Sequence, residues 1–230
     1  MESFEKPYTP KQPQDARQEI WKDLVSNIED YEREKGLEEI EVIQDADNRT
    51  SQVIESYGLQ STTLTPELVH LIKGQNWKEG HAFMSRDHGL FVCERRDLNE
   101  LRMEVVHEMF HYKGVNHLPI PLTEAIIERL TAQALNLENK NLEGGQVFSG
   151  IYTYPDFRLT LDKLLKLTVD RAPKGATNGF HTFSFFAKAH LTGDIGCLDF
   201  LNTIFDKGTL ENLQNLDDDH ESLVAFVENL

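Results

Sequence analysis

Apolar residues recur at helical spacing over most of this chain. One apolar stripe between residues 98 and 109 predicts a helix that ends at Gly114. A second helix is predicted to begin near Pro121, with its apolar positions directed inward. The stripe of the first helix comprises Leu98, Leu101, Val105 and Met109, and that of the second Ile126, Ile127, Leu130 and Ala134.

The rest of the pattern is also mainly helical. Residues 65–74, which begin with Thr-Pro and end at Gly74, predict a short helix, whereas residues 37–60 fit no single period. Two short β-prone runs, 81–85 and 89–94, are separated by three residues and predict a hairpin. Further helices are predicted over 15–35, 156–170, 180–192, 196–206 and 219–229. The predicted fold class is therefore α+β, mostly helical with a small sheet.

Composition narrows the classes of function. The 230 residues carry a net charge of −16, which argues against a nucleic-acid binder and against docking on anionic membranes. The sequence has no apolar run near the roughly 20 residues that span a bilayer, and its first 20 residues do not resemble a secretory signal. The two cysteines form no disulfide framework. We therefore expect a cytoplasmic protein, with residues 1–14, rich in Pro and Gln, as a flexible arm.

The first central helix contains the pattern H-E-x-x-H. His107 and His111 stand four positions apart, so both imidazoles share one helix face and can bind one Zn²⁺. Glu108 follows the first histidine and is placed to act as a general base on a water activated by the metal. A catalytic zinc site needs a third protein ligand and one open position.

The second central helix offers one candidate for that ligand. Its residues 122–131, LTEAIIERLT, resemble the N-E-G-x-x-E or D-E-A-x-T-E-x-L-T element of the gluzincins, a clan of zinc peptidases with small bacterial members. The resemblance implies that Glu124 is the third zinc ligand. It also implies that Glu128 orients His107 from behind. Without the metal, Glu124 would simply be a favourable acid near a helix N-terminus.

A competing pattern names His117 as the third ligand. Residues 107–117, HEMFHYKGVNH, fit the motif H-E-x-x-H-x-x-G-x-x-H and so resemble the metzincins, in which a glycine turns the chain toward a third histidine. That family has a methionine turn further along the chain, and no methionine follows His117 here. We therefore prefer Glu124. Gly114 is equally expected as an ordinary helix C-cap.

The resemblance implies a zincin-like catalytic domain over 76–230 with a helical C-terminal lobe, preceded by a helical N-terminal extension over 15–75. It also places Gly89–Glu94 where zincins have the edge strand that pairs with an extended peptide. The oxyanion formed during hydrolysis would be stabilised by one of three side chains. These candidates are Tyr152, Tyr154 and His181.

The expected function is that of a zinc-dependent metallopeptidase acting on a peptide or protein substrate. One alternative is a non-catalytic regulatory or interaction protein that keeps a zincin fold and its zinc. An intact Glu108 favours the enzyme, because a purely structural site has no need of a general base there. Another alternative is a closed structural site that uses both His117 and Glu124 and excludes water.

Overall fold

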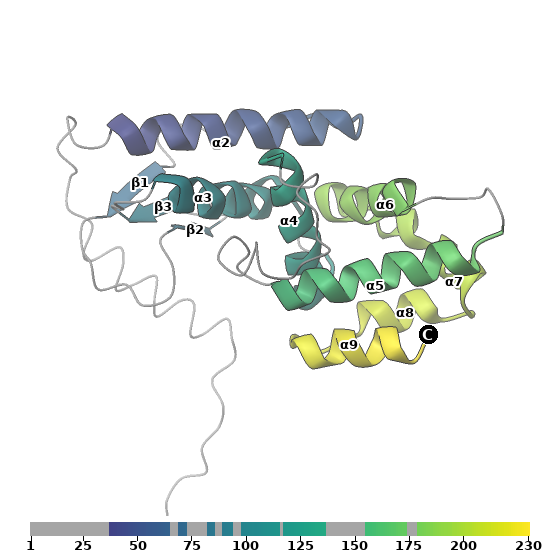
Figure 1. The fold of residues 1–230 in the computed structure, drawn as a ribbon. Coiled ribbons are helices and arrows are strands. Elements are labelled where there is room, and N and C mark those ends of the chain that lie inside the picture. The colour runs from purple at the N-terminus through teal and green to yellow at the C-terminus, as the bar shows by residue number, and fades with distance from the viewer. Residues whose placement is uncertain are drawn as a thin grey trace, which may run out of the picture.

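A computed structural model describes the chain over residues 37–64, 69–72, 82–85, 89–93, 98–115, 117–136, 155–173 and 179–230. The described part is mostly helical with one small sheet, which confirms the α+β class (Figure 1). The predicted arm (1–14) and the predicted helix over 15–35 lie outside the described residues. Within the described residues, no helix has both the length and the apolar character that crossing a bilayer requires.

The sheet has three strands in the order β1-β3-β2. β2 (Ala82–Ser85) and β3 (Gly89–Cys93) are antiparallel, which confirms the predicted hairpin. β1 (Val69–Ile72) pairs with β3 in parallel, so the prediction of a helix through these residues is wrong. The run Val-His-Leu-Ile has ordinary strand propensity, and pairing with a strand some 20 residues away overrides the local helix signal.

β3 is the central strand of this sheet. It pairs with β1 on one side and with β2 on the other, so the expectation that Gly89–Glu94 supplies the edge strand is wrong. Leu90, Phe91 and Val92 are buried, as expected for a central strand. Among the described strands, β2 is the edge next to the central helix α3.

Two packed helices form the centre of the molecule. α3 (Leu98–Lys113) and α4 (Ile120–Ala134) occupy the two ranges predicted from the apolar stripes. Most of these stripe residues are fully buried in one hydrophobic core. α4 is buried on nearly all its faces, which makes the two carboxylates on it, Glu124 and Glu128, costly unless they have partners.

α2 (Leu37–Ser56) lies along α3 on the side opposite β2 (Figure 1). Residues 37–60, which fit no single period in the sequence, thus form largely one long helix. Its buried residues Val42, Ile43, Ala46 and Ile54 belong to the same hydrophobic cluster as those of α3 and α4. α2 falls in the range expected as an N-terminal extension (15–75), and it shares its core with the two central helices.

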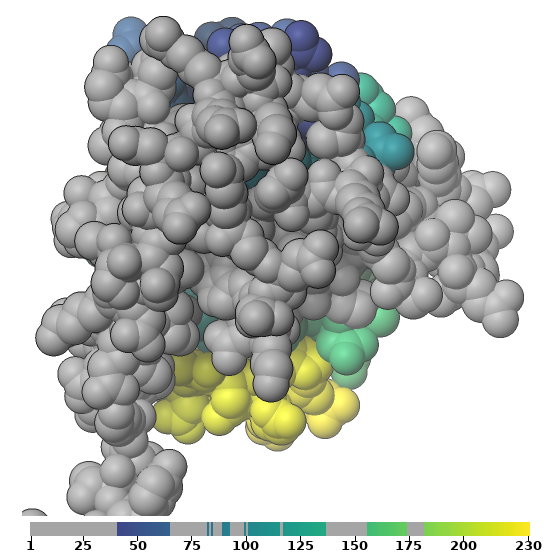
Figure 2. Space-filling view, turned by 90° about the vertical axis from the view of Figure 1, so that its left-hand side faces the viewer, coloured from purple at the N-terminus to yellow at the C-terminus, as the bar shows by residue number. Residues whose placement is uncertain are grey.

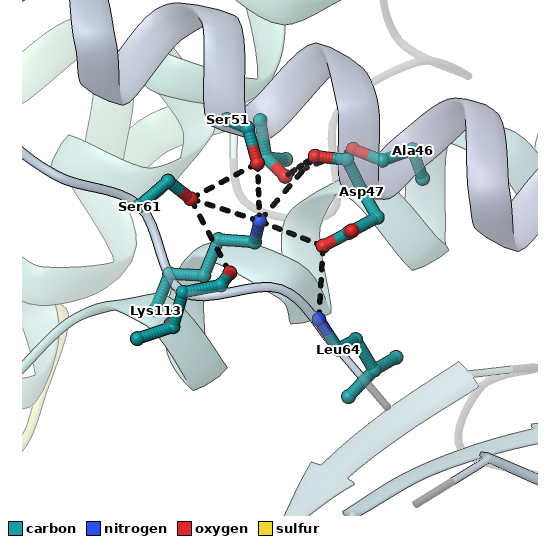
Figure 3. A network of polar contacts seen from close by, with 8 residues as sticks. Ala46, Asp47, Ser51, Ser61, Leu64 and Lys113 are labelled. Atoms are coloured by element: carbon teal, nitrogen blue, oxygen red, sulfur yellow. Dashed lines mark hydrogen bonds and ion pairs between the residues drawn. The ribbon is translucent and has the colours of Figure 1, made fainter. Parts of the chain in front are cut away.

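A buried lysine joins α2 to the end of α3. The Lys113 side chain has no exposed surface, and its Nζ lies 2.7 Å from Asp47 Oδ1 (Figure 3). Nζ also donates to Ser51 Oγ at 2.8 Å and to Ser61 Oγ at 3.1 Å. Asp47 Oδ1 accepts a further hydrogen bond from the Leu64 N–H at 3.3 Å. Lys113 therefore fastens both α2 and the segment after it to α3.

The C-terminal part packs on α4 through α5 (Pro155–Arg171), with α6 (Gly179–Thr192) and α9 (His220–Glu228) against α5. These three helices agree with the predicted ranges. The single helix expected over 196–206 is instead a 3₁₀ turn, Ile195–Leu198, followed by α7 (Phe200–Ile204). α8 (Thr209–Gln214) was not predicted. From the side, α2 lies at the top and the C-terminal helices at the bottom (Figure 2).

Candidate metal centre

Three ligand-type side chains from α3 and α4 meet at one point. His107 Nε2 lies 3.3 Å from His111 Nε2, as expected for imidazoles one helical turn apart. Glu124 Oε2 reaches both from α4, at 3.2 Å from His107 Nε2 and 3.4 Å from His111 Nε2. The structure thus brings together the three residues that the sequence named as zinc ligands.

These three distances fit the spacing of ligands around one zinc ion. Bonds of about 2.0–2.1 Å to a tetrahedral zinc place neighbouring ligand atoms about 3.3–3.4 Å apart. Glu124 Oε2 is buried and has no hydrogen-bond partner among the described residues, although it lies close to both imidazole nitrogens. A buried carboxylate oxygen near two nitrogens without a hydrogen bond is a natural metal ligand. The donor set, two imidazoles and one carboxylate, is one that zinc accepts.

The electrostatics of the cluster favour a positive charge. Burial alone would lower the pKa of His107, but the contact with Glu124 and the charges of Glu108 and Glu128 raise it to about 9. Burial alone would likewise raise the pKa of Glu124, but its contacts with His107 and His111 hold that pKa well below its usual value. Three carboxylates around one buried imidazole therefore favour a positive charge here, which a protonated imidazole or a bound cation supplies.

Glu108 lies beside the three ligands but is held differently. One ligand atom of Glu108 lies within 4.8 Å of those of His107 and His111. Its Oε2 accepts a hydrogen bond from the backbone N–H of Met84 on β2 at 2.9 Å. Burial raises the pKa of Glu108, and the charges of the two histidines partly offset that rise. Glu108 thus stands next to the cluster with one oxygen held by the protein backbone.

Glu128 contacts the far side of the first histidine. Its Oε1 lies 3.4 Å from His107 Nδ1, and its side chain is 1% exposed. An imidazole that ligates metal through Nε2 commonly places its Nδ1 against a carboxylate, which fixes the ring orientation. Glu128 occupies the position that the resemblance to gluzincins assigned to an orienting residue.

The structure places His117 elsewhere. A Cβ on Gly193, at the end of α6, would lie 2.5 Å from His117 Cδ2, so the His117 ring covers that glycine. Gly114 likewise makes room for His190, because a Cβ there would lie 2.3 Å from His190 Nε2. His190 is fully buried, and its carbonyl accepts a hydrogen bond from the Val115 N–H at 2.7 Å. The close packing of His190 on α6 thus explains why position 114 in the metzincin-like pattern is a glycine.

The three oxyanion candidates stay untested. Tyr152 and Tyr154 lie outside the described residues, and His181 lies on α6 with its side chain outside them. One group near the site was missed by sequence reasoning, namely the backbone N–H of Met84. A backbone N–H carries no residue-type signal, so only the strand pairing could have located it.

No protein family model, curated protein or solved structure matches this chain.

Proposed function

We propose that this chain is a zinc-dependent metallopeptidase of the gluzincin type, acting on a peptide or protein substrate. The observation that carries the proposal is the triangle formed by His107 Nε2, His111 Nε2 and Glu124 Oε2, with sides of 3.2, 3.3 and 3.4 Å. Glu108 beside it and Glu128 behind it complete a set of residues in which each has a chemical role.

Two features favour a catalytic site over a closed structural one. His117, which could have supplied a fourth protein ligand, covers Gly193. The His111 side chain is 20% exposed and that of Glu124 12% exposed, so one side of the cluster reaches solvent. Three protein ligands with access from solvent match the arrangement of catalytic zinc sites.

The residues divide the work of hydrolysis among them. His107, His111 and Glu124 would hold the metal, and Glu128 keeps the His107 ring oriented through Nδ1. When bound, zinc lowers the pKa of water and polarises the scissile carbonyl. Glu108 takes a proton from the attacking water as the C–O bond forms. It then gives that proton to the amine nitrogen as the C–N bond breaks.

The experiment is a hydrolysis screen with an unbiased peptide mixture and mass-spectrometric detection of products. The wild-type protein loaded with zinc is compared with Glu108→Gln at the same measured zinc content. We expect new peptide termini with the wild type and a rate at least about 100-fold lower with the variant, because general-base catalysis contributes about 10²–10⁴-fold. Equal rates for the two proteins, or no cleavage by zinc-loaded wild type, would overturn the proposal.

A further inference from the structure

The edge strand β2 offers one backbone group to the candidate site. β2 pairs with β3 in antiparallel register, with Met84 opposite Leu90 and Phe83 opposite Phe91. In such a ladder, alternate residues direct their N–H and C=O groups toward the partner strand or away from it. The Met84 N–H donates to Glu108 Oε2 at 2.9 Å, so Met84 occupies an outward-directed position. The backbone N–H and C=O groups that point toward β3 are then those of Phe83 and Ser85.

This hydrogen bond reaches the one residue of the motif that needs outside support. His107 and His111 each lie against Glu124 of α4, and His107 also lies against Glu128. A glutamate side chain has several rotatable bonds, and a general base works only when it is held within reach of the reacting proton. A backbone N–H on a paired strand is a rigid donor, and a hydrogen bond to a carboxylate is stronger than one between neutral groups.

We propose that the backbone N–H of Met84 is a positioning group that holds the Glu108 carboxylate beside the metal ligands. This inference rests on the proposed function for its catalytic consequence, but the hydrogen bond itself can be tested without any activity. Through this hydrogen bond the backbone of β2 contributes to the candidate site, whatever side chain stands at position 84. Met84 is thus a positioning residue that acts through Glu108.

Amide hydrogen exchange tests the contact directly. The Met84 amide has no partner on β3 in this register, so its protection depends on Glu108. We expect Met84 to exchange slowly in the full-length wild-type protein and at least about tenfold faster in Glu108→Ala, while Phe83 and Ser85, paired with β3, keep their rates. Fast exchange of Met84 in the wild type, or no change in Glu108→Ala, would overturn the inference.

Kinetics test the consequence. Met84→Pro removes the N–H without removing a ladder bond, since proline is accepted on an edge strand where its nitrogen faces outward. For Met84→Pro we expect kcat to fall at least about tenfold, with KM and zinc content retained. Met84→Leu keeps the N–H, so its kcat should stay close to that of the wild type. A Met84→Pro enzyme with the wild-type kcat would refute the positioning role.

The two experiments also separate this inference from the proposed function. If the wild-type protein cleaves no peptide, the peptidase proposal fails, and amide exchange still decides whether Met84 holds Glu108. If Met84→Pro does not fold, the exchange rates in wild type and Glu108→Ala decide the matter. Slow exchange that depends on Glu108 supports the inference, and its absence refutes it.

Discussion

Replacing Lys113 by methionine should be one of the most damaging single changes in this protein. Methionine keeps the apolar stem but removes an ammonium group that has no exposed surface and lies 2.7 Å from Asp47. It leaves the Asp47 carboxylate, whose side chain is only 13% exposed, without its cation. Breaking a buried pair by removing one partner costs about 3–5 kcal/mol, so we expect the free energy of unfolding to fall by about that amount.

Urea denaturation of the full chain, at matched zinc content, measures the loss. The matched control is Lys163→Met, because the ion pair of Lys163 with Glu228 joins two side chains that are 53% and 61% exposed. Its loss should change the stability by less than about 1 kcal/mol. The double variant Lys113→Met with Asp47→Leu should be less destabilised than the sum of the single variants, because no unpaired charge remains buried. A cost below about 1 kcal/mol for Lys113→Met would show that the buried pair with Asp47 contributes little to stability.

Three further changes bear on the metal centre and its surroundings. Glu128→Gln should weaken zinc affinity about 10–100-fold in a chelator competition, and unchanged affinity would contradict its role in orienting the first histidine ligand. His117→Ala should keep its zinc in the same assay, since the ring covers Gly193, the residue that follows α6, and loss of zinc would favour the metzincin-like ligand set. Gly114→Ala should lower the unfolding free energy by about 1–3 kcal/mol or more, because its Cβ would lie 2.3 Å from His190 Nε2. Gly196→Ala, whose Cβ would meet only the tip of a flexible side chain, is the control for that measurement.

The local parts of the site follow from the sequence. The four-residue spacing of His107 and His111 is a property of one helix, and apolar periodicity placed both α3 and α4. Glu124 could be named because residues 122–131 resemble the gluzincin element, which implies a ligand at that position. Its side chain reaches both histidines, which only the packing of the two helices determines.

The non-local contacts could not be read from the pattern. Lys113 and Asp47 are 66 residues apart, and nothing in either local sequence indicates that they pair in the core. Residues 69–72 fit a helical pattern locally, but they form β1 because they pair with β3. The same pairing makes β3 the central strand of the sheet instead of an edge strand. The hydrogen bond from Met84 to Glu108 depends on the register of β2, which side-chain identity does not specify.

The zinc content of three purified proteins decides whether His107, His111 and Glu124 bind a metal ion. Wild type, Glu108→Gln and Glu124→Ala are produced in parallel with ample zinc, desalted, and measured by metal analysis against protein concentration. The ligand triangle predicts about one zinc per chain in the wild type and in Glu108→Gln, and little zinc in Glu124→Ala. Wild-type protein without zinc, or Glu124→Ala protein that retains a full complement of zinc, would rule out this ligand set.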